Sequence, residues 1–386
     1  MSNLGDSIRQ AAVLIAKGQA KAALSLLSAL EVETRFDVDI VLHKALAYRF
    51  LNEFELAIIE VDRVLAKDPY NFVAMMSKAV IIERSGSARA AAQIYRNALR
   101  IAPEASALPV PMQQAAEHAR QVVEADALQL KKLLWDRLQL DDSRGRDQDN
   151  SDQLKETIDN YLGLKKIYRS EPVDLEVSRL PAIPFYDRSH FPWLEQLEAH
   201  ASAILKELIT FLERGKADFR PYVDFPAGVP VNQFQELNHS CKWSSLWLWR
   251  DGELQETAAP NFPATLRLME SLPLARQQGF GPTVLFSSLD AHTQIPPHTG
   301  STNARLLVHL PLIVPGPARF RVANDVRRFE FGKAWVFDDT IEHEAWNDSD
   351  EARLILIFDI WNPFLSADER RRISELLTIC RSWYAR

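Results

Sequence analysis

The sequence of 386 residues predicts a protein of two parts, an α-helical repeat array followed by a β-sandwich or jelly roll. Three observations lead to this fold class. Small residues recur every 34 positions in the first hundred residues, a polar segment then interrupts the helical pattern, and many short apolar runs separated by turn residues follow. We expect a repeat domain over residues 1–140, a linker and spacer helix over 141–178, and a β domain over 179–386.

The 34-residue period is visible at three sets of positions. These sets are Ala11, Ala45 and Ala79; Ala23, Ala57 and Ala91; and Gly18, Asn52 and Gly86. Small residues let paired helices approach closely, and Gly or Asn tolerates the left-handed backbone of a turn. The pattern resembles the tetratricopeptide (TPR) repeat, although another kind of helical-hairpin array would show similar spacing. The concave face of such an array can receive an extended chain, so we expect a peptide or protein to bind there.

Helical periodicity continues over residues 113–139 and resumes over 153–168. Between these stretches, residues 141–152 include no apolar side chain and predict an exposed loop. The second helical stretch is the expected spacer between the two domains.

The second half opens with a segment rich in Pro and aromatic residues, and we expect a long amphipathic helix to begin at Pro192. Ser366 and Glu369 have the spacing of a capping box for a final helix through Trp383. Between these helices the sequence predicts seven short strands, in the runs 244–251, 282–290, 304–314, 318–325, 327–331, 333–339 and 352–361.

Composition excludes some classes of protein. The formal net charge is −7 and the pI is about 5.8, so there is no basic surface to suggest a nucleic-acid partner. No run of 18 apolar residues is present, and the first residues lack the basic and apolar regions of a signal peptide. We therefore expect a cytoplasmic protein without a membrane span, and the two unpaired-looking cysteines agree with a reducing compartment.

Two histidines, His298 and His343, lie at the margins of apolar β-rich segments. Neutral imidazoles from separate strands form a natural iron or zinc site. Cys241 and Cys380 are far from both histidines in the sequence and form no CxxC pair, so a closed structural zinc site is not expected. Two histidines with open positions suit an iron that binds a chelating cosubstrate and dioxygen.

Three sequence blocks around these histidines carry a family resemblance: HTGSTNARLLVHLPLIVP, GKAWVFDDTIEHEAWN and RLILIFDIWNP. Together they resemble the aspartyl/asparaginyl β-hydroxylases, a family of Fe(II)- and 2-oxoglutarate-dependent oxygenases, over about residues 180–365. The resemblance implies a double-stranded β-helix, which is a cupin-like jelly roll, for the β domain. It also explains Gly300, because the family has an HxG motif where related iron enzymes carry a carboxylate.

The resemblance implies roles for individual residues. His298 and His343 would bind iron, with water in place of a third protein ligand. Arg353 would pair with the distal carboxylate of 2-oxoglutarate, a task suited to its planar fork of donors. Ser287 and His309 would contribute further contacts to 2-oxoglutarate. One of the carboxylates near His343 could orient its imidazole; these are Asp338, Asp339, Glu342 and Glu344.

Asn303, Arg305 and Trp243 are the candidates for substrate contact, and Arg305 could face an acidic group of the substrate. Leu307 departs from the family pattern, because better-known animal members carry a basic residue there. Cosubstrate binding is therefore expected to depend on Arg353, Ser287 and His309.

The resemblance thus implies a dioxygenase that uses Fe(II), 2-oxoglutarate and dioxygen to hydroxylate the β-carbon of an Asp or Asn residue. That residue would belong to a peptide, a protein or a peptide-like metabolite. Three alternatives stay open. They are a halogenase, with chloride at the open iron position; a lipid hydroxylase, although no membrane anchor is visible in the sequence; and a non-enzymatic adaptor whose oxygenase domain has decayed.

Overall fold

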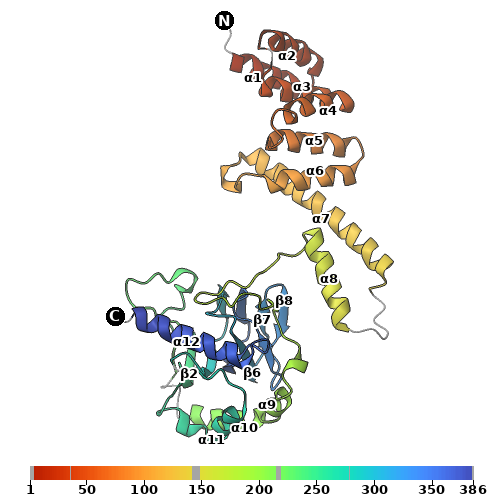
Figure 1. Cartoon of the computed structure of the whole chain (residues 1–386). Helices are drawn as coiled ribbons and strands as arrows, with labels where there is room; N and C mark the ends of the chain where they lie inside the picture. Colours follow the sequence, from red (N-terminus) through yellow and green to blue (C-terminus); the bar gives the residue numbers. More distant parts are fainter. Residues whose placement is uncertain (1–3, 35, 141–147, 214–218, 278, 385–386) are drawn as a thin grey trace. The chain divides into compact units, whose positions relative to one another are not determined.

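The computed structural model describes the chain in five stretches, residues 4–34, 36–140, 148–213, 219–277 and 279–384. Contacts divide it into two compact units, Met1–Lys165 and Lys166–Arg386 (Figure 1). This division falls within the expected linker and spacer. Of the predicted loop at 141–152, residues 141–147 lie outside the described residues and residues 148–152 are helical.

The first unit contains the predicted helical repeat. Its first described helices form three successive pairs, which are α1 (Leu4–Ala16) with α2 (Ala20–Thr34), α3 (Val38–Phe50) with α4 (Phe54–Leu65), and α5 (Phe72–Arg84) with α6 (Ala88–Arg100). The first helices of the pairs begin at residues 4, 38 and 72, and the second helices begin at residues 20, 54 and 88. The helices therefore have the 34-residue period of the sequence, while their identity as TPR repeats stays a prediction.

The small residues of the repeat occupy the contacts between helices. The alanines of both sets are buried, in the three cores between neighbouring helices. The turn residues have backbone φ angles of 77°, 60° and 94° at Gly18, Asn52 and Gly86. These positive angles are the reason that the turn position carries only Gly or Asn.

Two further helices complete this unit. Helix α7 (Val110–Leu138) packs on α6, and α8 (Gln148–Leu162) packs on α7 through Ile158 and Leu162 against Ala127. The helix expected as a spacer is therefore part of the first unit. Within the described part of the chain, no helix combines the length and apolar character that crossing a bilayer requires.

The second unit is a jelly roll built from two antiparallel sheets. The larger sheet has the strand order β1-β2-β4-β11-β6-β9, with β3 paired to β2, and the smaller has the order β5-β10-β7-β8. The larger sheet contains β1 (Arg220–Pro221), β2 (Trp243–Arg250), β3 (Glu253–Leu254), β4 (Val284–Leu289), β6 (Arg305–Ile313), β9 (Trp335–Phe337) and β11 (Arg353–Trp361). The smaller contains β5 (Thr293–His298), β7 (Ala318–Val322), β8 (Asp325–Arg328) and β10 (His343–Asn347).

Strand alternation gives the larger sheet two buried faces. Its inner face packs on the smaller sheet in a core that includes Trp243, Ile355 and Phe320. Its outer face, with residues such as Leu310 and Leu356, is covered by the helices α9 (Leu194–Ala199), α10 (Ala201–Leu212) and α11 (Pro263–Ser271), which Figure 1 shows beside the sheet. Sheets and helices thus enclose two apolar layers.

Most of the predicted elements of this unit are present. Each of the seven predicted strand runs overlaps a strand, and the capping box is formed. The Ser366 N–H donates to Glu369 at 2.8 Å, and the Glu369 N–H donates to Ser366 Oγ at 3.3 Å at the start of α12 (Ala367–Tyr384).

Two predictions need correction. The single helix expected from Pro192 is two helices. Helix α9 ends at Ala199, and its C-cap residue His200 donates its N–H to the carbonyl of Leu197, while its imidazole bonds the carbonyl of Gln196. Strands β5 and β10, and the two-residue strands β1 and β3, were not predicted. Two prolines in β5 and the lack of any β-branched residue in β10, whose sequence is HEAWN, weaken the strand signal in each.

Candidate metal and cosubstrate site

His298 and His343 are brought together by adjacent strands of the smaller sheet. They are register partners at the ends of β5 and β10, and their ring centroids are 4.1 Å apart. The Nδ1 of His298 lies 2.8 Å from the carbonyl oxygen of Pro296, and the Nδ1 of His343 lies 3.0 Å from that of Ile341. With Nδ1–H donating to these carbonyls, each Nε2 keeps its lone pair for a metal.

The two imidazoles are held in the neutral form that a metal requires. Burial lowers the pKa of His298 below its usual range. Burial, followed by the nearby His298, lowers the pKa of His343 still further. The acceptor for His343 is the Ile341 carbonyl, so the expectation that a carboxylate orients this imidazole is corrected.

Gly300 is two residues after His298, where the family resemblance implies that a third ligand is missing. Among the described residues, no group of three or more His, Cys, Asp or Glu side chains is arranged to hold a metal ion. A Cβ atom added to Gly300 would lie 1.9 Å from Oδ2 of Asp339, so the Asp339 carboxyl group already fills this space. Burial, with Asp338 nearby, raises the pKa of Asp339 to about 7. The donor set therefore fits an iron with two protein ligands and open coordination positions.

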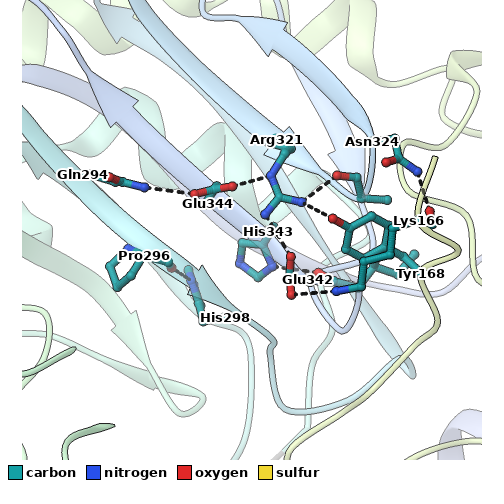
Figure 2. A network of polar contacts seen from close by, with 12 residues as sticks. Lys166, Tyr168, Gln294, Pro296, His298, Arg321, Asn324, Glu342, His343 and Glu344 are labelled. Carbon is teal, nitrogen blue, oxygen red and sulfur yellow. Dashed lines mark hydrogen bonds and ion pairs between the residues drawn. The ribbon is translucent and has the colours of Figure 1, made fainter. Parts of the chain in front are cut away.

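A polar network supports the strands that carry the histidines (Figure 2). Arg321, on β7, donates to Glu344 and, at 2.9 Å, to Glu342, while Gln294 on β5 donates to Glu344 at 3.0 Å. Arg321 also donates to the hydroxyl of Tyr168 at 3.1 Å. The two glutamates flank His343 in the sequence, so these bonds tie β5, β10 and β7 together around it.

The second half of the site is a buried cation, Arg353, which forms no ion pair with the described residues. Arg353, on β11, is 1% exposed, and its Nε and Nη1 have no hydrogen-bond partner among the described groups. Its guanidinium lies 4.8 Å from the ring centroid of Phe329, and burial lowers its pKa to about 9. An unpaired buried charge costs several kcal/mol, so this position is built to receive an anionic group.

Two further polar groups lie in the same cavity. His309 is buried, and its Nδ1 has no partner among the described groups. Burial and the nearby Arg353 keep the pKa of His309 well below its usual range, so it is neutral. Ser287 Oγ accepts a hydrogen bond from Trp243 Nε1 at 3.2 Å and can still donate its own proton. Together with the Arg353 fork, these groups suit a carboxylate.

The cavity that joins the two halves measures about 520 Å³. It is lined by six of the predicted site residues, which are His298, His343, Arg353, Ser287, His309 and Trp243. Each comes from a different strand, so the fold gathers residues that are widely separated in the sequence. The strands are β2, β4, β5, β6, β10 and β11.

The structure does not place the other two candidates in this cavity. Asn303 bonds both backbone polar groups of Val177, at 2.7 and 3.1 Å. Arg305 forms an ion pair of 2.7 Å with the buried Asp359 and also donates to the carbonyl of Phe280. Both side chains thus make structural contacts with the chain itself, and the substrate contacts expected of them stay predictions.

Sequence reasoning missed several residues of the site. The segment 170–175, expected to be linker, crosses the ends of both histidine strands. The Glu171 N–H donates to the Thr340 carbonyl at 2.8 Å, and the Val173 N–H donates to that of Gly300 at 2.9 Å. Asp339 was missed as a neighbour of Gly300, and only the adjacent acidic pair in FDDT could have drawn attention to it.

Known proteins resemble the second unit. Residues 198–363 match the family model described as aspartyl/asparaginyl beta-hydroxylase. The human aspartyl/asparaginyl beta-hydroxylase is 32% identical over 183 residues, which are 47% of this chain and 24% of the human protein. The ornithine lipid ester-linked acyl 2-hydroxylase of Rhizobium tropici is 31% identical over 200 residues, which are 51% of this chain and 67% of that protein.

Two further matches are less similar in sequence to this chain. The human aspartate beta-hydroxylase domain-containing protein 2 is 26% identical over 198 residues, covering 50% of this chain and 51% of that protein. A Schizosaccharomyces pombe Cnp3 cupin domain has 9% identity and a TM-score of 0.22 over 34% of this chain and 71% of its own, so the jelly-roll assignment rests on the strand pairing instead.

The chain spans about a quarter of the length of the human and mouse β-hydroxylases that it matches. The shared part contains both histidines, the HxG motif and Arg353. By the family model and the match to the Rhizobium hydroxylase, this chain belongs to the aspartyl/asparaginyl β-hydroxylase family.

Proposed function

We propose that this protein is an Fe(II)- and 2-oxoglutarate-dependent dioxygenase that hydroxylates an aliphatic carbon. The observation that carries the proposal is one cavity with two neutral imidazoles at one point and a buried Arg353, unpaired among the described groups, at another. This combination supports a metal held at the histidines and a dicarboxylate that extends from it to the arginine.

Each residue then has a defined task. The Nε2 atoms of His298 and His343 would hold the iron, and Arg353 would bind the far carboxylate of 2-oxoglutarate through two parallel hydrogen bonds. Ser287 and His309 would position the same cosubstrate. The bound iron, with 2-oxoglutarate and dioxygen, supplies the oxidising chemistry; the protein supplies placement and exclusion of water.

The apolar walls around the histidines protect this chemistry. The ring centroids of Phe320 and Phe337 lie 5.7 and 5.6 Å from that of His343. Both rings are buried and line the cavity, so they keep bulk water from this side of the metal position.

The proposal does not by itself identify the substrate. The family resemblance favours the β-carbon of an Asp or Asn residue in a peptide, a protein or a peptide-like metabolite. The Rhizobium relative is named for an acyl chain instead. A polypeptide that presents the substrate would bind in the helical repeat unit.

Two alternatives are less well supported. A halogenase would bind chloride at the open iron position, and no contact of the described residues favours chloride over water there. An adaptor without a ligand here would retain the unfavourable burial of Arg353 with no hydrogen bond to its Nε and Nη1 from the described groups.

The direct test is anaerobic addition of Fe(II) and 2-oxoglutarate to the full-length protein. The bidentate complex should give a weak visible charge-transfer band, and His343→Ala should abolish it. Air should then produce succinate in the wild type. A folded wild-type protein without the band and without succinate would overturn the proposal in favour of the adaptor.

A further inference from the structure

We propose that residues 224–239 form a lid over the histidine end of the cavity, and that Phe234 is the latch that holds this lid against His298. The proposal rests on the proposed function, because it takes His298 as a metal ligand. It adds a positioning residue and a moving segment to that site. Three features carry it, which are the anchoring of the segment, its exposure and the ring contacts of Phe234.

The two ends of the segment are held together at its base. Beside these ends, Val223 and Leu237 are buried in the core between the two sheets. The His239 N–H donates to the carbonyl of Val223 at 2.9 Å. The Phe225 N–H donates to Oδ1 of Asn238 at 2.8 Å. Because both ends are fixed at one place, the residues between them form a closed loop that can pivot about its base.

The part of the loop between these anchors is exposed. Of residues 224–236, all are exposed except Val231 and Phe234, which are half-buried. Val229, near the tip, is 45% exposed. A segment that buries so little apolar surface has low local stability, so it opens more readily than the strands around it.

Phe234 differs from the rest of the loop because its ring lies against the histidine site. It ends the short 3-10 helix η3 (Asn232–Phe234), which lies beside β5. Its ring centroid is 5.3 Å from that of His298, with the two ring planes at 70°, and 6.3 Å from that of Trp243. Phe234 also lines the cavity, so its ring joins the loop to the site.

His298 is the less enclosed of the two histidines. It ends β5, which is an edge strand of the smaller sheet and has β10 as its neighbour among the described strands. His343 lies on β10, between β5 and β7, and is 6% exposed, whereas His298 is half-buried. Besides His343, the described rings near His298 are those of Phe234 and Trp243. Phe234 can therefore hold the His298 imidazole in the orientation that a metal requires.

Opening of the lid changes the site in two ways at once. Phe225, which also lines the cavity and is 37% exposed, lies on the same loop as Phe234. Movement of the loop about its base therefore removes a wall from the cavity and a ring contact from His298 together. The closed loop excludes water from the histidine site, and the open loop admits cosubstrate and substrate.

Hydrogen exchange tests the latch without any metal. In the metal-free full-length protein, the amides of residues 224–239 should exchange faster in Phe234→Ala than in the wild type. Phe234→Tyr, which keeps the ring, should exchange as the wild type does. The matched control, Phe331→Ala, removes an exposed phenylalanine outside the loop and the cavity and should leave this exchange unaltered. Equal exchange in Phe234→Ala and the wild type would overturn the lid.

Metal release tests the support of His298. Co(II), a probe with a visible ligand-field spectrum, is bound anaerobically to the full-length protein and then removed with excess chelator. Loss of one aromatic contact should speed release from Phe234→Ala about three- to tenfold. Phe234→Tyr and Phe331→Ala should release Co(II) at the wild-type rate. Release from Phe234→Ala at that same rate would overturn the role of Phe234 in positioning His298.

Failure of the proposed function gives a different result. A folded wild-type protein without the charge-transfer band and without succinate would overturn the oxygenase proposal. If it also bound no Co(II), the positioning role at His298 would be overturned with it. The exchange comparison in the metal-free protein would still decide whether Phe234 latches the loop.

Discussion

Arg353 shows how a single residue can be unfavourable for folding and necessary for the proposed function. Its guanidinium is fully buried on β11, and two of its nitrogen atoms have no partner among the described groups. Neighbouring carboxylates are used elsewhere, since Asp359 pairs with Arg305 and Glu344 pairs with Arg321. Under the proposed function, the carboxylate of 2-oxoglutarate would supply the missing partner and offset this cost.

We therefore predict that Arg353→Met makes the metal-free protein more stable. Replacing an unpaired buried charge with an apolar side chain of similar length should raise the free energy of unfolding by about 1–4 kcal/mol. The same change should abolish the 2-oxoglutarate charge-transfer band. Urea denaturation and the anaerobic titration measure the two effects, and Arg353→Lys, which keeps the charge, should gain no stability. A less stable methionine variant would show that Arg353 already has a partner.

Asp339 gives a prediction about pH. Burial raises its folded pKa to about 7, whereas an unfolded Asp titrates near its usual, lower value. Between these two pKa values the folded state holds a proton that the unfolded state has lost. The stability that this group contributes is therefore fully present below the unfolded pKa and is lost as pH rises to about 7.

The Asp339→Asn variant removes this titration. It should gain stability relative to the wild type as pH rises from about 4 to about 7, and the difference should then level off. Chemical denaturation of the metal-free proteins at several pH values measures the difference. A difference that is constant with pH would mean that Asp339 is ionised throughout this range.

Single elements of the fold depend on the small residues at their contacts. In helix α4, Ala57 is fully buried against the neighbouring helices, whereas Glu55 is exposed two residues earlier. A buried alanine recurs at the equivalent position of each repeat, because a pair of helices with 34-residue spacing meets its neighbours at equivalent positions.

Ala57→Leu should therefore destabilise the helical unit by about 1–3 kcal/mol, because there is no space for the additional atoms. Glu55→Leu, which adds a leucine to the exposed face of the same helix, should change stability by no more than about 0.5 kcal/mol. Thermal unfolding followed by circular dichroism compares the two. Equal effects would contradict the tight contact at Ala57.

The histidine strands show where element prediction was limited. The strands β5 and β10 position both proposed ligands, yet two prolines in the first and the lack of β-branched residues in the second weakened their strand signal. Their existence depends on pairing with each other and with β7, which alternation along one short segment cannot show.

The whole molecule has two compact units with separate apolar cores. The proposed metal and cosubstrate site lies entirely within the second unit, residues 166–386. A ligand stabilises the part of the protein that must be folded to bind it.

We predict two thermal transitions in calorimetry of the full-length protein. Anaerobic Fe(II) with 2-oxoglutarate should raise the temperature of only one, and Arg353→Ala should remove that shift. Saturation at about 100 times the dissociation constant corresponds to about 2.7 kcal/mol. One cooperative transition that shifts as a whole would instead show that the two units unfold together.

Local sequence patterns were sufficient to predict much of the fold of this protein. The 34-residue period, the alternation in seven strands and the capping box at Ser366 each depend on residues close in the sequence, and the structure contains all three. The motif blocks also led to His298, His343, Arg353 and His309, which the structure brings into one cavity together with Ser287.

Contacts between residues that are distant in the sequence could be identified only from the tertiary structure. The pairing of Arg305 with Asp359, the filling of the Gly300 space by Asp339 and the crossing of the site by residues 170–175 all join parts of the chain that no local pattern links. The apolar cavity wall has the same origin, because β6 and β11 contribute to it only after they pair. Side-chain type and spacing predict which face a residue occupies, but the opposing residue depends on how the two sheets pack.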